Sequence, residues 1–157
     1  MDCGTEDPGE RAISESAHKS TGGFRFEVPF VDHLGARLLS CADGAAHVEM
    51  ELVQHHLNTF GGAHGGVTMT LLDYTMAMAA TARGHHADTE KMSVVTIEMK
   101  TSFLQPAQGK RLVTHARCVH RTRSLAFCEA EVADDAGRVL ARASGTFKYT
   151  PLSRAPR

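Results

Sequence analysis

One acidic residue stands alone in a long apolar stretch of the sequence. Asp73 is the only formally charged residue between Glu51 and Arg83. A carboxylate in such surroundings is costly to bury unless a partner pairs with it or a reaction uses it. A carboxylate that is used in this way can act as a general base on water. The alternative is an aspartate that a neighbouring hydroxyl or amide satisfies in the core, and the residue alone leaves both interpretations open.

Two glycines precede this stretch at the point where a helix should begin. Gly65 and Gly66 leave the backbone uncovered, so the N–H groups of the first helical turn can approach a ligand closely. The partial positive charge at a helix N-terminus suits the stabilisation of an oxyanion formed from a carbonyl group. The alternative is that the glycines only make a tight turn.

The spacing between these two features predicts an oligomer. Asp73 follows Gly65 by eight residues, which separates them by about 12 Å along one helix axis. That distance is too large for both groups to act comfortably on one carbonyl. A second copy of the helix, supplied by a dimer, would place Asp73 of one subunit beside Gly65 of the other. We therefore expect a homodimer, assembled further into a homotetramer.

The elements that must position these groups are one helix and several strands. The helix should span roughly residues 66–82, and Gly84 marks its end. It is apolar nearly all round, with one stripe formed by Val67, Leu71, Tyr74 and Met78. Strand patterns occupy residues 36–41, 46–52, 93–104, 111–120, 124–132 and 138–149.

An apolar helix must be buried, and a single helix is enclosed only when the sheet curls around it. Short connections, such as the Asp43-Gly44 hairpin signal, indicate antiparallel neighbours. The predicted fold class is therefore α+β, with a curved antiparallel sheet wrapped around one long central helix.

The domain organisation is simple. Residues 1–23 have no apolar pattern and are expected to form a loose tail, residues 24–150 one domain, and residues 151–157 a C-terminal tail. Near the start of the domain, apolar residues alternate at Phe24, Phe26, Val28 and Phe30.

Composition excludes several classes of function. The formal net charge is −1, so no overall field favours nucleic acid or an anionic membrane. A membrane span over residues 65–82 would place Asp73 at its centre, which is costly. No signal peptide is visible, and the four cysteines form no C-x-x-C pair, so we expect a cytoplasmic protein with reduced thiols. The paired histidines His55-His56 and His85-His86 lack further ligands at familiar spacing, so no metal is expected.

The same residues carry a resemblance to a known family. The run Asn-x-x-Gly-x-x-His-Gly-Gly-x6-Asp from Asn58 to Asp73, with the later Phe-x-x-Pro-Ala-x-Gly from Phe103 to Gly109, resembles the hotdog-fold thioesterases. The subgroup it resembles is the PaaI-like, phenylacetate-pathway type of acyl-CoA thioesterase. The resemblance covers about residues 24–149 in the right order, without a large gap.

The resemblance implies a role for each matching residue. Asp73 matches the catalytic carboxylate, which activates water or attacks the thioester itself, and Gly65 matches the glycine whose N–H polarises the carbonyl. Asn58 matches the asparagine that orients the water or the carboxylate across the subunit interface. His64 matches a histidine near the thioester, and Thr96 stands where a relative carries a serine that helps to hold the water.

The implied reaction converts an acyl- or aryl-CoA thioester and water into a carboxylic acid and free CoA. It needs no cofactor, because CoA is part of the substrate. Gly66 belongs to the helix start that would bind the substrate. Arg121 and Arg123, in the connection HRTRS, could meet the phosphates of CoA, although a solvated hairpin tip is an equal interpretation.

Two other functions remain open at this point. The first is an acyl-CoA-binding module without catalysis, because a fold does not determine a function. The second is a hotdog enoyl-CoA hydratase or dehydratase, whose usual catalytic His with Asp or Glu is not found in this sequence. The acyl group that would be accepted cannot be read from the residues.

Overall fold

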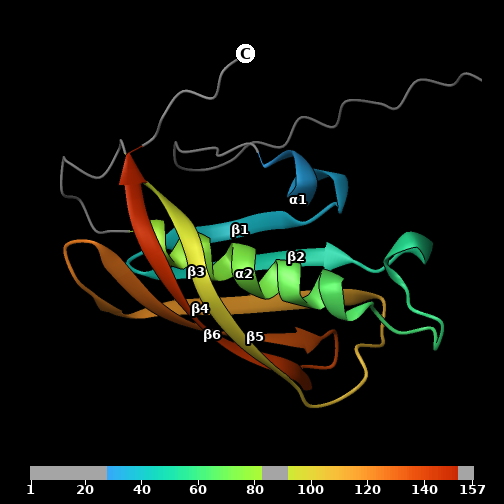
Figure 1. Ribbon diagram of the computed structural model, residues 1–157. Coiled ribbons are helices and arrows are strands. Elements are labelled where there is room, and N and C mark those ends of the chain that lie inside the picture. The colour runs from blue at the N-terminus through green and yellow to red at the C-terminus, as the bar shows by residue number, and fades with distance from the viewer. Residues whose placement is uncertain (1–27, 83–91, 152–157) are drawn as a thin grey trace, which may run out of the picture.

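The computed structural model describes residues 28–82 and 92–151. Its elements in chain order are α1 (Pro29–His33), β1 (Arg37–Ala42), β2 (Ala45–Glu51), the 3-10 turn η1 (Gln54–His56), α2 (Gly65–Thr81), β3 (Met92–Phe103), β4 (Arg111–Arg121), β5 (Leu125–Asp134) and β6 (Val139–Pro151). The six strands form one antiparallel sheet in the order β1-β2-β4-β5-β6-β3. The sheet curves around α2, as Figure 1 shows.

The predicted α+β class, the long helix and the strand patterns are confirmed. The Asp43-Gly44 turn is a hairpin with positive φ at both residues, 49° and 80°, which matches the twist of the strands that it joins. The sequence assigned no element to the apolar alternation around Val28 and Phe30, and the structure has the short helix α1 there. Pro29 is pre-organised for the first turn of a helix, which explains why a helix begins there.

Parts of the expected organisation lie outside the described residues. These are the tail 1–23, the helix end at Arg83 and Gly84, and His85 with His86. Within the described ranges, no helix combines the length and apolar character needed to cross a membrane.

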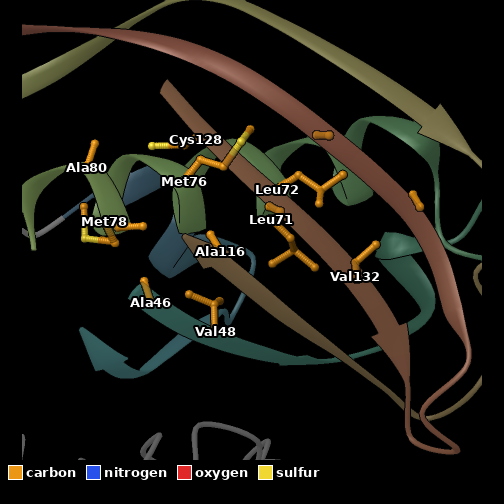
Figure 2. Packing of buried hydrophobic residues seen from close by; sticks show 14 of the residues in the cluster. Ala46, Val48, Leu71, Leu72, Met76, Met78, Ala80, Ala116, Cys128 and Val132 are labelled. Atoms are coloured by element: carbon orange, nitrogen blue, oxygen red, sulfur yellow. The ribbon is translucent and has the colours of Figure 1, made fainter. Parts of the chain in front are cut away.

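Helix α2 has two unlike faces. The face on the sheet is a stripe of buried residues at helical spacing: Thr68, Leu71, Leu72, Thr75, Met76 and Ala79. These side chains pack with the inner faces of the strands into one core, part of which is shown in Figure 2. Val67 and Tyr74, which the sequence placed in the stripe that includes Leu71, are only half-buried. The opposite face carries Asp73, so the carboxylate avoids the core.

Strand β3 lies at an edge of the sheet and is distorted where it passes the helix. Its pairing with β6 shifts between Thr96 and Glu98, which leaves Ile97 as a bulge. The bulge allows both Thr96 and Met99 to face α2, although they are three residues apart. Val95 and Ile97 point away, with exposed fractions of 50% and 55%.

Candidate active site

Asp73 is held by a hydroxyl group from the edge strand. The Oγ1 of Thr96 donates a hydrogen bond of 2.8 Å to Oδ1 of Asp73. The carboxyl is half-buried, and this burial raises its pKa above the ordinary value, while the hydrogen bond from Thr96 opposes the rise. In its ionised form, a carboxylate with a raised pKa is a stronger base than a free aspartate.

A cavity of about 640 Å³ opens beside this carboxylate. It lies between α2, β3 and the segment around α1. Its wall is mostly apolar, with Asp73 as its only acidic residue. The lining residues include Phe30, Met69, Asp73, Tyr74, Met78 and Met99. The cavity can therefore hold an apolar group next to a base.

The start of α2 presents one backbone donor. His64 is the N-cap residue, and its Nδ1 accepts a hydrogen bond of 3.0 Å from the N–H of Gly66. The N–H groups of Val67 and Thr68 both donate to the carbonyl of His64. Within residues 28–82 and 92–151, the N–H of Gly65 has no hydrogen-bond acceptor. Of the two glycines predicted to bind substrate, only Gly65 therefore has a free N–H.

Phe103 covers the start of the helix and was missed as a site residue. A methyl group on Gly65 would lie 3.4 Å from Cζ of Phe103, so the ring stands directly against this glycine. Its exposed fraction is 54%, which is high for a phenylalanine. The only sequence signal was its position as the first residue of the Phe-x-x-Pro-Ala-x-Gly pattern.

Asn58 organises the loop that leads to the helix. Its Oδ1 accepts hydrogen bonds from the N–H groups of Phe60 (2.8 Å) and Gly62 (3.3 Å). Its Nδ2 donates to the carbonyl of Ala63 over 3.4 Å. Inside one protomer the amide of Asn58 is thus engaged in its own loop. The role across a subunit interface stays a prediction.

The second family pattern supports this same loop. The carbonyl of Ala107 accepts a hydrogen bond of 2.7 Å from the N–H of Ala63. A methyl group on Gly62 would stand 3.2 Å from that carbonyl oxygen, a tight contact, so the approach favours a glycine. The two patterns quoted from the sequence therefore pack against each other and hold the start of α2 in place.

Arg121 lies at the other end of α2 from Gly65. Its Nη2 donates to the carbonyls of Ala79 (2.9 Å) and Ala82 (3.1 Å). The sequence offered Arg121 as a phosphate contact or a solvated tip residue, whereas the structure gives it the role of a helix cap. Arg123 is exposed on the β4–β5 connection, where it can still meet an anion.

The described histidines and acids do not form a metal centre. Within residues 28–82 and 92–151, no group of three or more His, Cys, Asp or Glu side chains could hold an ion. The rings of His55 and His56 meet edge to face, with 4.3 Å between their centroids, and His56 is buried.

The protomer therefore brings together Asp73 and Thr96 at one place, and His64, Gly65, Asn58 and Phe103 at another. This division agrees with the separation along the helix that the sequence predicted.

Comparison with known proteins places this arrangement in a family. A model of the thioesterase superfamily matches residues 60–141. This range includes all of the residues just named except Asn58. The chain belongs to the thioesterase superfamily. It is a thioester hydrolase, and the sequence-based prediction of an enzyme of this class is confirmed.

Curated relatives cover most of the chain. A putative esterase of Archaeoglobus fulgidus is 32% identical over 114 residues, which are 72% of this chain and 70% of that protein. Acyl-coenzyme A thioesterase 13 of Homo sapiens is 32% identical over 113 residues, which are 69% of this chain and 76% of that protein.

Solved structures confirm the predicted hotdog fold. A thioesterase family protein from Silicibacter pomeroyi superimposes with a TM-score of 0.72 at 28% identity and covers 79% of this chain and 90% of its own. A variant of the phenylacetic acid degradation protein PaaI from Thermus thermophilus superimposes with a TM-score of 0.68 at 30% identity, covering 77% of this chain and 98% of its own.

Proposed function

We propose that the chain hydrolyses an acyl- or aryl-CoA thioester to the carboxylic acid and free CoA. The observation that carries the proposal is Asp73, a carboxylate held by Thr96 at the wall of an apolar cavity. A relative named for acyl-CoA thioester hydrolysis supports the choice of substrate class. The acyl part would occupy the cavity, where the methionine side chains can adapt to its shape.

The chemistry follows from two groups. The carboxylate of Asp73 either removes a proton from a water that attacks the thioester carbonyl or attacks that carbon itself. The carbonyl oxygen then carries negative charge, and a free backbone N–H at the start of a helix stabilises it. The tetrahedral intermediate collapses by breaking the C–S bond, and CoA leaves as a thiolate that takes up a proton. If Asp73 attacks the carbon itself, this step gives an anhydride between the acyl group and Asp73, which water then hydrolyses to the carboxylic acid and the free carboxylate. Gly65 supplies the only N–H of the described first turn that is available for this role.

The two groups would come from different subunits of a homodimer. Gly65 and Asp73 lie about 12 Å apart along one axis, which is too far for both to act on one carbonyl. Strand β3 offers an unpaired edge, and the exposed Val95, Ile97 and Phe103 lie along it. A second copy on this edge would cover these side chains and place its own helix start near the first cavity. Pairing of two such dimers into a tetramer remains part of the proposal.

The proposal is tested with Asp73→Asn and a panel of CoA thioesters with aryl, short, medium and long acyl groups. We expect kcat to fall by at least about 10³-fold on every substrate that the native chain hydrolyses, because general-base or nucleophilic catalysis is lost. Sedimentation of both proteins should give the same assembly.

Three outcomes would contradict the proposal or one of its parts. Full activity of Asp73→Asn would show that the carboxylate is not catalytic. Tight binding of acyl-CoA by the native chain, with no hydrolysis of any member of the panel, would favour a binding module. A monomer under active conditions would remove the two-subunit site.

A further inference from the structure

Two cysteines face each other on neighbouring strands, far from the residues assigned to hydrolysis. Cys118 of β4 is directly opposite Cys128 of β5 in the register of the sheet. The N–H of Cys118 donates to the carbonyl of Gly44, on the side of β4 that faces away from β5. The two cysteines are therefore a non-hydrogen-bonded antiparallel pair, at the last regular position before a bulge at Val119. In such pairs the Cα atoms lie about 4.5 Å apart and the side chains share one face.

That geometry falls within the range in which a disulfide can form. Disulfides join residues whose Cα atoms are about 4.4–6.8 Å apart, so a bond between Cys118 and Cys128 needs no large movement of the backbone. Both side chains are free thiols in the structure. Burial raises the pKa of Cys128, and the neighbouring thiol of Cys118 adds to the rise.

The two thiols differ in their access to solvent. Cys128 is buried in the core between the sheet and α2, in the same layer as Met76 (Figure 2). Cys118 is only half-buried and packs at the margin of that core. A small oxidant in solution can therefore reach Cys118 first.

We propose that Cys118 and Cys128 form a thiol–disulfide modification site, which a low-molecular-weight disulfide oxidises to a cross-strand disulfide. The thiolate of Cys118 attacks one sulfur of the small disulfide and expels the other as a thiolate. The thiolate of Cys128 then attacks Sγ of Cys118, forms the intramolecular bond and releases the second small thiol. Two protein thiols are oxidised, the small disulfide is reduced to two thiols, and the two protons pass to these products.

The new bond would tie together the hairpin that supports the end of α2. The β4–β5 hairpin carries Arg121, which caps the helix at Ala79 and Ala82. A cross-link here restricts the unfolded chain, so the oxidised protein should be more stable than the reduced one. The site is independent of the proposed hydrolysis, and its test does not depend on activity.

The experiment treats the reduced full-length protein with an excess of oxidised glutathione. We expect peptide mapping to join the peptides of Cys118 and Cys128 in a product two hydrogen atoms lighter than the two reduced peptides together; glutathione adducts on the exposed Cys41 do not affect this measurement. The unfolding temperature should rise by several degrees and return to its first value after treatment with an excess of a monothiol. Cys41→Ser, which removes another thiol of the described chain, is the matched control and should behave like the native protein.

Single replacements at the site separate the two steps. Cys128→Ala should stop at a glutathione adduct on Cys118, whereas Cys118→Ser should leave Cys128 unmodified. If Cys128→Ala fails to fold, the peptide map of the native protein still tests whether Cys118 and Cys128 are joined. Adducts at Cys118 that never give way to the linked peptides would overturn the proposal, as would a disulfide that joins either thiol to Cys41.

Discussion

The two ends of α2 differ in whether their backbone groups find hydrogen-bond partners outside the helix. At the C-terminal end, side chains and a turn satisfy the last carbonyls. The bonds are from Arg121 to Ala79 and Ala82, from the N–H of Gly44 to Ala82, from Tyr149 to Ala80, and from Thr81 and Cys41 to Met78. At the N-terminal end, His64 satisfies Gly66, but the N–H of Gly65 has no acceptor in the part of the chain that the structure describes.

This contrast separates stability from chemistry within one helix. A helix leaves four N–H groups and four carbonyls without partners inside itself, and burying them unpaired is costly. At the C-terminal end, Arg121 of β4 and other donors satisfy the carbonyls, which anchors the helix in the sheet. The end that carries Gly65 keeps one donor for a ligand, in the place where the helix dipole favours negative charge. Each end can be tested by a change that should leave the other intact.

Among changes at the two ends of the helix, the largest effect is expected from Gly65→Pro. Proline suits the first position of a helix and lacks an N–H, and His64 already has the extended backbone (φ −61°, ψ 140°) that a residue before proline needs. The change therefore removes the proposed oxyanion donor with little cost to the fold. We expect kcat for a CoA thioester to fall by about 10²–10³-fold, with a circular dichroism spectrum like that of the native protein.

Gly65→Ala is the matched control, because alanine keeps the N–H. Its methyl group would meet Cζ of Phe103 at 3.4 Å, an ordinary contact. Its loss of kcat should be much smaller than that of the proline variant. Equal activity of the folded proline variant and the native chain would exclude Gly65 as the oxyanion donor.

At the C-terminal end of α2, Arg121→Met should lower stability rather than catalysis. The change leaves the carbonyls of Ala79 and Ala82 without a charged donor, so the free energy of unfolding should fall by about 1–3 kcal/mol. Urea unfolding monitored by circular dichroism measures this, and kcat of the folded variant should stay within a few-fold of the native value.

Arg123→Met on the same connection provides the contrast. Its side chain is exposed, so stability should change little. If Arg123 contacts the phosphates of CoA, KM should rise several-fold and the rise should shrink at high salt. A loss of stability as large as that of Arg121→Met would contradict the assignment of the cap to Arg121.

The sequence indicated candidate residues for the site, but it did not indicate most of the contacts that these residues make. Asp73 could be singled out because it is the only charge in its stretch, and the helix and strands could be read from their periodicity. The resemblance, rather than any pattern of spacing, indicated Thr96, whose hydrogen bond to Asp73 depends on a bulge at Ile97 that no local signal encodes. Arg121 was offered as a phosphate ligand or a solvated tip residue, because its contact with the helix end joins residues about forty positions apart.

Between the two ends, Thr96→Val should raise the pKa of Asp73 and leave its carboxylate less well oriented, without unfolding the site. The hydrogen bond from Thr96 lowers the pKa of Asp73 against the effect of burial, so its removal should raise that pKa further. The acidic limb of the profile of kcat/KM against pH should therefore move to higher pH, with about a tenfold loss of kcat from poorer orientation. Thr96→Ser keeps the hydroxyl and should restore both; a limb that is unmoved in Thr96→Val would contradict the assignment of that limb to Asp73.

The smallest expected effect is on stability, and it tests whether the carboxylate of Asp73 makes the folded protein less stable. Because burial raises the pKa of Asp73 in the folded protein above its ordinary value of 3.8, the folded state binds this proton more tightly than the unfolded state does. Stability therefore falls as the pH rises from that ordinary value through the raised pKa, and above it the folded protein carries a half-buried charge. Asp73→Asn removes the charge and keeps an oxygen that can accept from Thr96. Urea unfolding should show the variant to be more stable than the native protein at pH 7, by a margin that shrinks toward pH 4. If the variant is no more stable at pH 7, or if its advantage grows toward acid, the ionised carboxylate does not destabilise the fold. Its position in an apolar helix would then not need a functional explanation.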